Sequence, residues 1–270
     1  MNLIRNPISP TNRPKWRLNA WDALALLIVF AVLAFLGWNA KQMAKPYEIG
    51  QTSIVTLDSA LLPFYAGRTV LRMLIAMCVS LLFTFIFGTW AAKSKRAGRF
   101  IIPIIDILQS VPILGYLSVV TVFFIGLFPG SFLGPECAAI FVIFTSQAWN
   151  MALGFYQTVR TVPPEIIEAS RMFHLSTWQR FWRIDVPFSL PVLLWNMMAS
   201  MSAGWFFVVA SEAISVANQA ILLPGIGSYI ALAIQGANLK AISEAVLAMF
   251  IVILIYDQLL FRPLIAWAEK

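Results

Sequence analysis

The fold is decided by Val186–Ser211, VPFSLPVLLWNMMASMSAGWFFVVAS, a stretch without a single charged residue. A helix that crosses the roughly 30 Å hydrocarbon core of a bilayer needs about 20 predominantly apolar residues. Prolines and a glycine interrupt the stretch, which packed membrane helices tolerate when their neighbours satisfy the freed backbone groups. Val186–Ser211 is therefore expected to span a membrane.

Five further apolar runs flank this stretch and have a similar length. The chain has 270 residues, of which 60% are hydrophobic and 11% charged, whereas a soluble domain carries about 25% charged residues. No alternating strands of about ten residues occur, which disfavours a membrane barrel. The composition predicts an all-α membrane protein of one domain with six transmembrane helices. The other five runs are Trp21–Trp38, Thr69–Ala91, Ile101–Leu127, Cys137–Tyr156 and Ala245–Phe261.

The lysines and arginines between the runs predict the orientation, because cytoplasmic loops are enriched in these residues. With the N-terminus inside, fourteen of them fall in inner segments, four in outer segments, and Arg72 in the second helix. We therefore expect both termini in the cytoplasm, and the net charge of +7 does not indicate a nucleic-acid partner. The inner group is Arg5, Arg13, Lys15, Arg17, Lys93, Lys95, Arg96, Arg99, Arg160, Arg171, Arg180, Arg183, Arg262 and Lys270; the outer group is Lys41, Lys45, Arg68 and Lys240.

Two outer segments shape the expected organisation. The long mixed segment Asn39–Arg68 separates the first run from the other five. Residues 1–60 are thus expected to hold a cytoplasmic tail, an uncleaved first helix and an outer linker, and residues 61–270 the main transmembrane domain, with a cytoplasmic loop over residues 157–185. The segment Glu212–Lys240 contains Pro224, Gly225 and Gly227, which favours a partly re-entrant stretch.

The cytoplasmic segment Thr161–Pro187, TVPPEIIEASRMFHLSTWQRFWRIDVP, predicts two short helices. Pro163 and Pro164 suit a first helical turn, which does not need their missing N–H groups, and an acidic Glu165 suits the positive end of the helix dipole. Ser176 is a typical N-cap for the second helix. The residues alone leave two roles open: a helix that anchors the loop at the membrane interface, or one that binds a partner.

The order of residues in this segment resembles the EAA loop of type I ATP-binding cassette importer permeases. That pattern reads Glu-Ala-Ala, three residues, Gly, nine residues, Ile, one residue, Leu-Pro. Glu168, Ala169 and Ser170 match its first triplet, and Ile184, Val186 and Pro187 match its end. The glycine position holds His174, the one clear departure, which puts the backbone angle between the two helices in question.

The resemblance implies that Glu165–Leu175 is a coupling helix. In that family, the helix inserts into a groove on the ATPase subunit and passes nucleotide-driven closure to the membrane helices. Carried over to this chain, the implied coupling residues are Glu165, Glu168, Ala169, Ser170, His174 and Pro187, with Glu168 as the main polar contact.

Other motifs extend the resemblance over roughly Leu61 to Lys270. In order and spacing they are similar to permeases of the nitrate, sulfonate and taurine group, and to one half of the larger duplicated anion permeases. This implies a five-helix type I core preceded by an N-terminal helix. The motifs are Leu71-Arg72, Gly88, Pro103 with Asp106 and Gln109-Ser110-Val111-Pro112, Gly204-Trp205, Val209-Ala210-Ser211-Glu212, Leu223-Pro224-Gly225-Ile226-Gly227-Ser228-Tyr229, and Tyr256-Asp257 with Phe261-Arg262.

Motifs for catalysis and cofactor binding are missing from the sequence. It has no Gly-Lys pair and hence no G-x-x-x-x-G-K-[ST] loop, so we expect ATP hydrolysis in a separate subunit and neither cofactor nor catalytic residues here. Cys78 and Cys137 show no metal-ligand spacing. An intramembrane aspartyl hydrolase built on Asp106 and Asp257 is the alternative from another class, although nothing in the sequence brings these two carboxylates together.

Polar side chains at membrane depth are pathway candidates, because burying them in lipid is unfavourable, although hydrogen bonding between helices explains the uncharged ones equally well. The sequence thus predicts half of a translocation pathway for a small anion such as nitrate, sulfonate, taurine or bicarbonate, with another small organic solute as the alternative. The implied partners are ATPase subunits, a second permease subunit, a periplasmic or lipoprotein solute-binding protein and the lipids of a bacterial inner membrane. The pathway candidates are Gln147, Asn150, Ser200, Ser202, Glu212 and Asn218.

Overall fold

The computed structural model describes residues 34, 35, 37–41, 43, 46, 55–216 and 219–268. Within these residues, four helical stretches are long and apolar enough to cross a membrane: Ser59–Lys93, Leu133–Arg160, Thr177–Glu212 and Leu239–Ala268. The all-α membrane fold is thus confirmed. Most of the expected first helix, Trp21–Trp38, lies outside the described residues.

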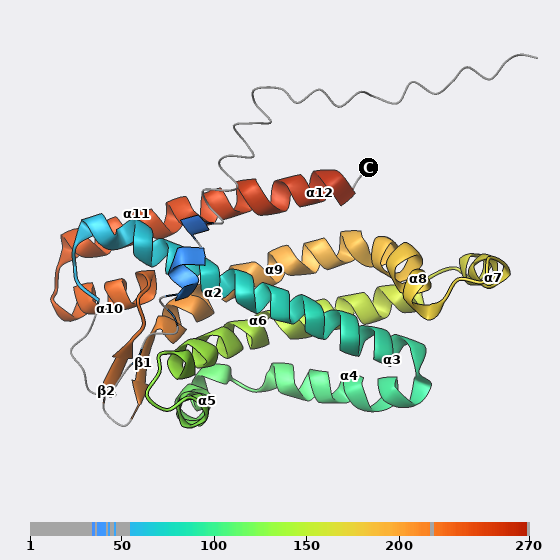
Figure 1. Ribbon diagram of the computed structural model, residues 1–270, viewed down its shortest axis with the longest axis horizontal. Helices are drawn as coiled ribbons and strands as arrows, with labels where there is room; N and C mark the ends of the chain where they lie inside the picture. The colour runs from blue at the N-terminus through green and yellow to red at the C-terminus, as the bar shows by residue number, and fades with distance from the viewer. Residues whose placement is uncertain are drawn as a thin grey trace, which may run out of the picture.

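The helices form an elongated bundle in which the long spans run side by side (Figure 1). In chain order the elements are η1 (Ser59–Leu61), α2 (Leu62–Phe83), η2 (Thr84–Gly88), α3 (Thr89–Lys93), α4 (Lys95–Ser110), α5 (Ile113–Leu127), α6 (Leu133–Arg160), α7 (Pro164–Met172), α8 (Thr177–Arg180), η3 (Phe181–Asp185), α9 (Val186–Glu212), β1 (Ala213–Val216), β2 (Gln219–Leu222), α10 (Ile226–Gln235), α11 (Leu239–Tyr256), η4 (Asp257–Phe261) and α12 (Arg262–Ala268).

Helix α6 lies at the centre of the bundle. It packs against α2, α5 and α9, and it is the most buried of the four spans. The main core gathers Met73 from α2, Phe155 from α6, Met197 from α9 and Tyr256 from α11. Unbranched methionines fill the irregular gaps between crossing helices.

The first described span begins ten residues earlier than its apolar run. Asp58 caps it by accepting a hydrogen bond from the N–H of Ala60 (2.9 Å), and Pro63 lies in the first turn of α2, where a missing N–H is harmless. Arg68 therefore lies inside α2 and is buried. The expectation that it belongs to an outer loop was wrong, because its charge is neutralised within the bundle.

The expected helix Ile101–Leu127 is two helices, α4 and α5. Val111 and Pro112 between them have extended backbone angles, since the residue before a proline is disfavoured in helical conformation. Pro103, in contrast, stays inside α4.

The hairpin of β1 and β2 follows α9 directly. The strands are antiparallel with Ala213 opposite Leu222, and the short helix α10 follows them. Figure 1 places this hairpin and α10 at one end of the bundle, and α3, α7 and α8 at the other.

Candidate functional site

Helix α7 projects from the end of the bundle and is exposed along most of its length (Figure 1). Pro164 opens it, with Glu165 in the first turn, as the sequence predicts. Its side chains Glu165 and Glu168 are exposed, as is Ile166, whereas Ser170 is buried and donates a hydrogen bond to the carbonyl of Ile167 (2.6 Å). Ala169 is half-buried.

Large apolar side chains are exposed both at the end of α7 and on α8. Met172 and Phe173 are 75% and 76% exposed, and Trp178 is 69% exposed. Single exposed apolar residues are ordinary, whereas adjacent large ones mark an interaction surface. A projecting helix with exposed acidic and apolar side chains can make both polar and apolar contacts with a groove on another protein.

His174 adopts the left-handed backbone conformation, with φ of 49°. The N–H of Leu175 donates to the carbonyl of Ser170, and the N–H of His174 to that of Arg171, both at 3.0 Å. These two bonds are the Schellman motif that ends many helices, usually with glycine at the left-handed position. His174 therefore has the positive φ that the glycine of the EAA pattern adopts easily.

The second half of the segment returns to the bundle. Ser176 caps α8 with a capping box to Gln179, as expected. Phe181 is buried and lies against Phe85 of η2, with ring centroids 5.6 Å apart. Asp185 is fully buried and its Oδ2 lies 2.7 Å from Nζ of Lys93. Pro187 follows in the first turn of α9 and is exposed.

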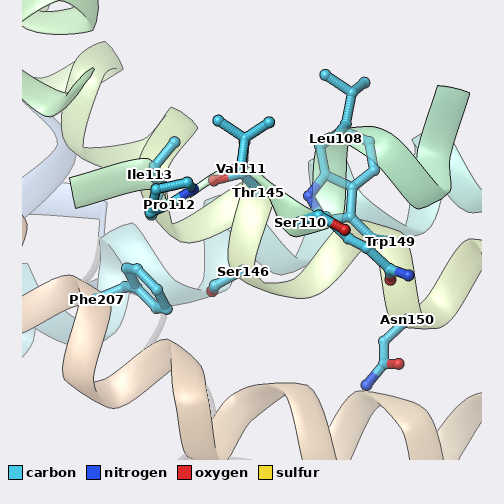
Figure 2. Close-up of a pocket in the computed structure, with 11 residues that line it drawn as sticks. Leu108, Ser110, Val111, Pro112, Ile113, Thr145, Ser146, Trp149, Asn150 and Phe207 are labelled. Atoms are coloured by element: carbon cyan, nitrogen blue, oxygen red, sulfur yellow. The ribbon is translucent and has the colours of Figure 1, made fainter. Parts of the chain in front are cut away.

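A cavity of about 400 Å³ opens where α4 and α5 meet α6 and α9. The end of α4 contributes Gln109 and Ser110 to its lining, and the break between α4 and α5 contributes Pro112. Helix α6 contributes Thr145, Ser146, Trp149 and Asn150, and α9 contributes Phe207 (Figure 2). All of these lining residues are uncharged.

The structure brings only one of the predicted pathway residues to this cavity, the exposed Asn150. Gln147 is fully buried one turn away, where its Oε1 accepts from Ser80 at 3.5 Å. Ser200 is buried and Ser202 exposed, both on α9. Asn218 lies outside the described residues.

Glu212, the remaining pathway candidate, belongs to a buried cluster of charges. Its Oε1 lies 2.6 Å from Nη1 of Arg72, and its Oε2 accepts from the N–H of Gly227 at 2.6 Å. Glu136 pairs with Arg68 at 2.5 Å and with Nε of Arg72 at 2.6 Å. Two arginines thus balance two glutamates, and all four side chains are at most 1% exposed.

Sequence reasoning missed this cluster, although a signal was present. Arg72 falls within an apolar run, and a charge at membrane depth requires a partner. The described residues contain no group of His, Cys, Asp and Glu side chains arranged to hold a metal ion.

The bundle of apolar spans defines a multi-spanning membrane protein, from which one exposed helix, α7, projects (Figure 1). Residues 84–261 match the family described as "Binding-protein-dependent transport system inner membrane component". The chain belongs to this family of ATP-binding cassette importer permeases, in which ATP hydrolysis resides in a separate subunit.

Curated relatives fall into more than one transport group. The chain is 25% identical to the glycine betaine transport system permease protein OpuAB of Bacillus subtilis, over 88% of this chain and 77% of OpuAB. It is 28% identical to the glycine betaine/proline betaine permease ProW of Escherichia coli, over 74% of this chain and about half (54%) of ProW. It is 24% identical to the nitrate import permease NrtB of Synechococcus elongatus, over 75% of this chain and 66% of NrtB. The narrower nitrate, sulfonate and taurine group therefore stays a prediction.

Among solved structures, the chain is similar to one of the inward-facing MetNI methionine ABC transporter. The TM-score is 0.62 at 18% identity, over 78% of this chain and 97% of the other. This likeness supports the type I permease fold.

Proposed function

We propose that this chain forms half of the translocation pathway of a binding-protein-dependent importer, and that α7 is its coupling helix. The observation that carries the proposal is α7 itself. It projects from the bundle (Figure 1) with exposed carboxylates and exposed apolar side chains, and the EAA-like triplet Glu168-Ala169-Ser170 lies on it. A helix that only anchored the loop in lipid would not need two acidic residues on its exposed surface.

In this proposal the coupling residues have different roles. Glu168, and Glu165 one turn before it, bind polar groups of an ATPase groove, while Ile166, Met172 and Phe173 fill its apolar part. Ser170 and the half-buried Ala169 face the rest of the loop and fix how α7 leaves the bundle. His174 sets the angle between α7 and α8, and Pro187 begins the helix that receives the movement.

The proposed pathway runs along the cavity between α4, α5, α6 and α9. Its hydroxyl and amide side chains, among them Ser146, Asn150 and Gln109, can donate hydrogen bonds without holding a charge tightly. A pathway needs this property, because a solute must leave as readily as it enters. A second copy or a similar chain completes the pathway about a two-fold axis.

For the substrate, we propose a small solute with an oxyanion group. The names of the relatives include nitrate and glycine betaine; nitrate is an oxyanion, and glycine betaine carries a carboxylate. The uncharged donors in the cavity suit such groups with or without a balancing positive charge. The small anion expected from the sequence falls within this class.

The proposed orientation places α7 and both termini in the cytoplasm of a bacterium, with the chain in the inner membrane. Lys93, Arg96, Arg160 and Arg183 lie at or near the end of the bundle that carries α7, as the enrichment of basic residues in cytoplasmic loops requires. The hairpin and α10 then face a solute-binding protein on the other side.

Reconstitution tests the proposal. The chain is placed in liposomes with the ATPase subunit and the solute-binding protein of the same organism, and uptake of radiolabelled nitrate, taurine and glycine betaine is measured with and without ATP inside. We expect ATP-dependent uptake of at least one of these, abolished without the binding protein. Uptake that needs neither ATP nor the binding protein would contradict the proposal.

A further inference from the structure

The span Ser59–Lys93 has no direct chain connection to the coupling segment, by which we mean residues 161–185 between α6 and α9. Helices α6 and α9 flank the segment in the sequence, so the backbone itself carries any movement of α7 into them. The span of α2, η2 and α3 can follow only through side-chain contacts. Those contacts therefore decide whether a third membrane helix moves with α7.

Two kinds of contact join this span to the coupling segment. Phe85 of η2 packs its ring against Phe181 and Trp182 of η3, at centroid distances of 5.6 and 6.2 Å. Nearer the end of the span, Lys93 forms its ion pair with Asp185, whose side chain is fully buried. Rings packed edge to face can shift across one another, whereas an ion pair joins two particular atoms.

The burial of Asp185 makes the ion pair persistent. A carboxylate removed from water is strongly unfavourable unless a cation remains beside it. Arg180 is a second cation, but its Nε lies 3.8 Å from Oδ1 of Asp185, and it belongs to the coupling segment itself. Lys93 is thus the partner that comes from the other span.

Both contact points lie at or next to π-helical turns. Phe85 belongs to η2 and Asp185 ends η3. Such turns are rare and occur frequently at functional sites.

We propose that Lys93 and Asp185 are positioning residues that make the span Ser59–Lys93 move together with the coupling segment. This inference rests on the proposed function, since it requires α7 to be moved by an ATPase. The span leads through Ser94 directly into α4, which lines the cavity together with α6 and α9. Without the pair, ATPase closure would still move α6 and α9, but α4 would stay in place and the cavity would not close.

The test measures access to the cavity while ATPase closure is monitored separately. The chain carries Cys78→Ala and Cys137→Ala, with Ser146→Cys in the cavity as the only thiol, and is assembled with its ATPase subunit in lipid nanodiscs. The rate of labelling by a small maleimide is compared without nucleotide and with ATP plus vanadate. Retained ADP reports vanadate trapping, and hence closure of the ATPase.

The variants separate coupling from folding. Lys93→Met removes the connection but leaves Arg180 beside the buried carboxylate, and Asp185→Asn removes the charge itself. Lys93→Arg keeps the cation. Lys95→Met is the matched control, because Lys95 is exposed and pairs with no carboxylate among the described residues.

We expect normal vanadate trapping in all four variants. The nucleotide-dependent change in labelling rate should be lost in Lys93→Met and Asp185→Asn, and kept in Lys93→Arg and Lys95→Met. A full change in Lys93→Met would overturn the inference. If the single variants disappear from the membrane, the same labelling is measured on the double variant Lys93→Met with Asp185→Asn, which buries no unpaired charge. If the double variant is lost as well, the pair is a folding contact only and the inference is overturned.

Failure of the proposed function gives a different result. In that case the unsubstituted chain would not retain the ATPase subunit, or would show no change in labelling with ATP and vanadate. A wild-type response that survives in Lys93→Met would instead leave the proposed function intact and remove only the role of the pair.

Discussion

Arg72 of α2 and Glu212 at the end of α9 form an ion pair in which both side chains are completely buried, with Nη1 and Oε1 2.6 Å apart. Glu212 also accepts hydrogen bonds from Thr69 and from the N–H of Gly227. One carboxylate thus joins two spans to the first turn of α10.

Removing Arg72 should strongly destabilise the fold. Loss of one partner from a buried ion pair leaves an uncompensated charge, at a cost of about 3–5 kcal/mol. Arg72→Met should lower the thermal unfolding midpoint of the purified chain markedly. Lys240→Met is the control, because the pair of Lys240 and Glu244 is exposed and 3.9 Å apart and contributes less than about 1 kcal/mol. Equal midpoints for the two variants would contradict the importance of the cluster.

Gly225→Ala should disturb the same cluster by crowding. A Cβ at this position would overlap the carboxylate of Glu212, whereas nothing lies within 4 Å of a Cβ on Gly126. Overpacking of this kind costs about 1–3 kcal/mol. We expect Gly225→Ala to unfold at a lower temperature than Gly126→Ala, and the reverse order would show that the loop adjusts freely.

His174→Gly should be tolerated and should stabilise the end of α7. The left-handed conformation of His174 costs a residue with a side chain about 1 kcal/mol, and glycine avoids this. His174→Val should have the opposite effect, because a branched side chain is the least compatible with positive φ. Binding of the ATPase subunit to the three proteins checks the account. Weaker binding by His174→Gly would mean that the imidazole itself contacts the partner.

Asn150 and Gln147 should respond differently to alanine, although their sequence contexts are alike. Asn150→Ala, at an exposed lining position, should change stability by less than about 0.5 kcal/mol and should lower uptake. Gln147→Ala removes a fully buried side chain and one of the two acceptors of the Ser80 hydroxyl, the other being the carbonyl of Phe144, at about 0.5–1.5 kcal/mol for the lost hydrogen bond. Unfolding midpoints and uptake rates, measured for both variants, distinguish a residue needed for helix packing from one that contacts the solute. Loss of the Asn150→Ala protein from the membrane would contradict a role of Asn150 in the pathway.

The local features of the coupling segment were predictable because they depend on neighbouring residues. Pro164 begins α7 and Ser176 caps α8, as helix-start rules require. Of the six spans that the apolar runs predicted, four coincide with the four described spans. The run Ile101–Leu127 is broken at Pro112, because an average over apolar residues does not register a single backbone angle.

The pairing of distant charges could not be predicted in the same way. Glu136 and Arg68 are 68 residues apart, and Lys93 and Asp185 are also remote in sequence. Which charges meet depends on how helices remote in sequence pack against each other, as α2 and α6 do around Arg68 and Glu136. The position of Arg72 within an apolar run indicated that a carboxylate must pair with it, but the sequence did not identify which carboxylate.

If α7 binds an ATPase subunit through Glu168, the affinity between the two proteins must depend on this carboxylate. Glu168 is exposed, so Glu168→Ala should leave folding unchanged, whereas truncating a charge that becomes buried in a complex costs about 2–5 kcal/mol. The dissociation constant for the ATPase subunit, measured in nanodiscs, should therefore rise about thirtyfold or more. Glu244→Ala, at the start of α11 and at the opposite end of the bundle, should leave it unchanged. Full affinity in Glu168→Ala would contradict the account.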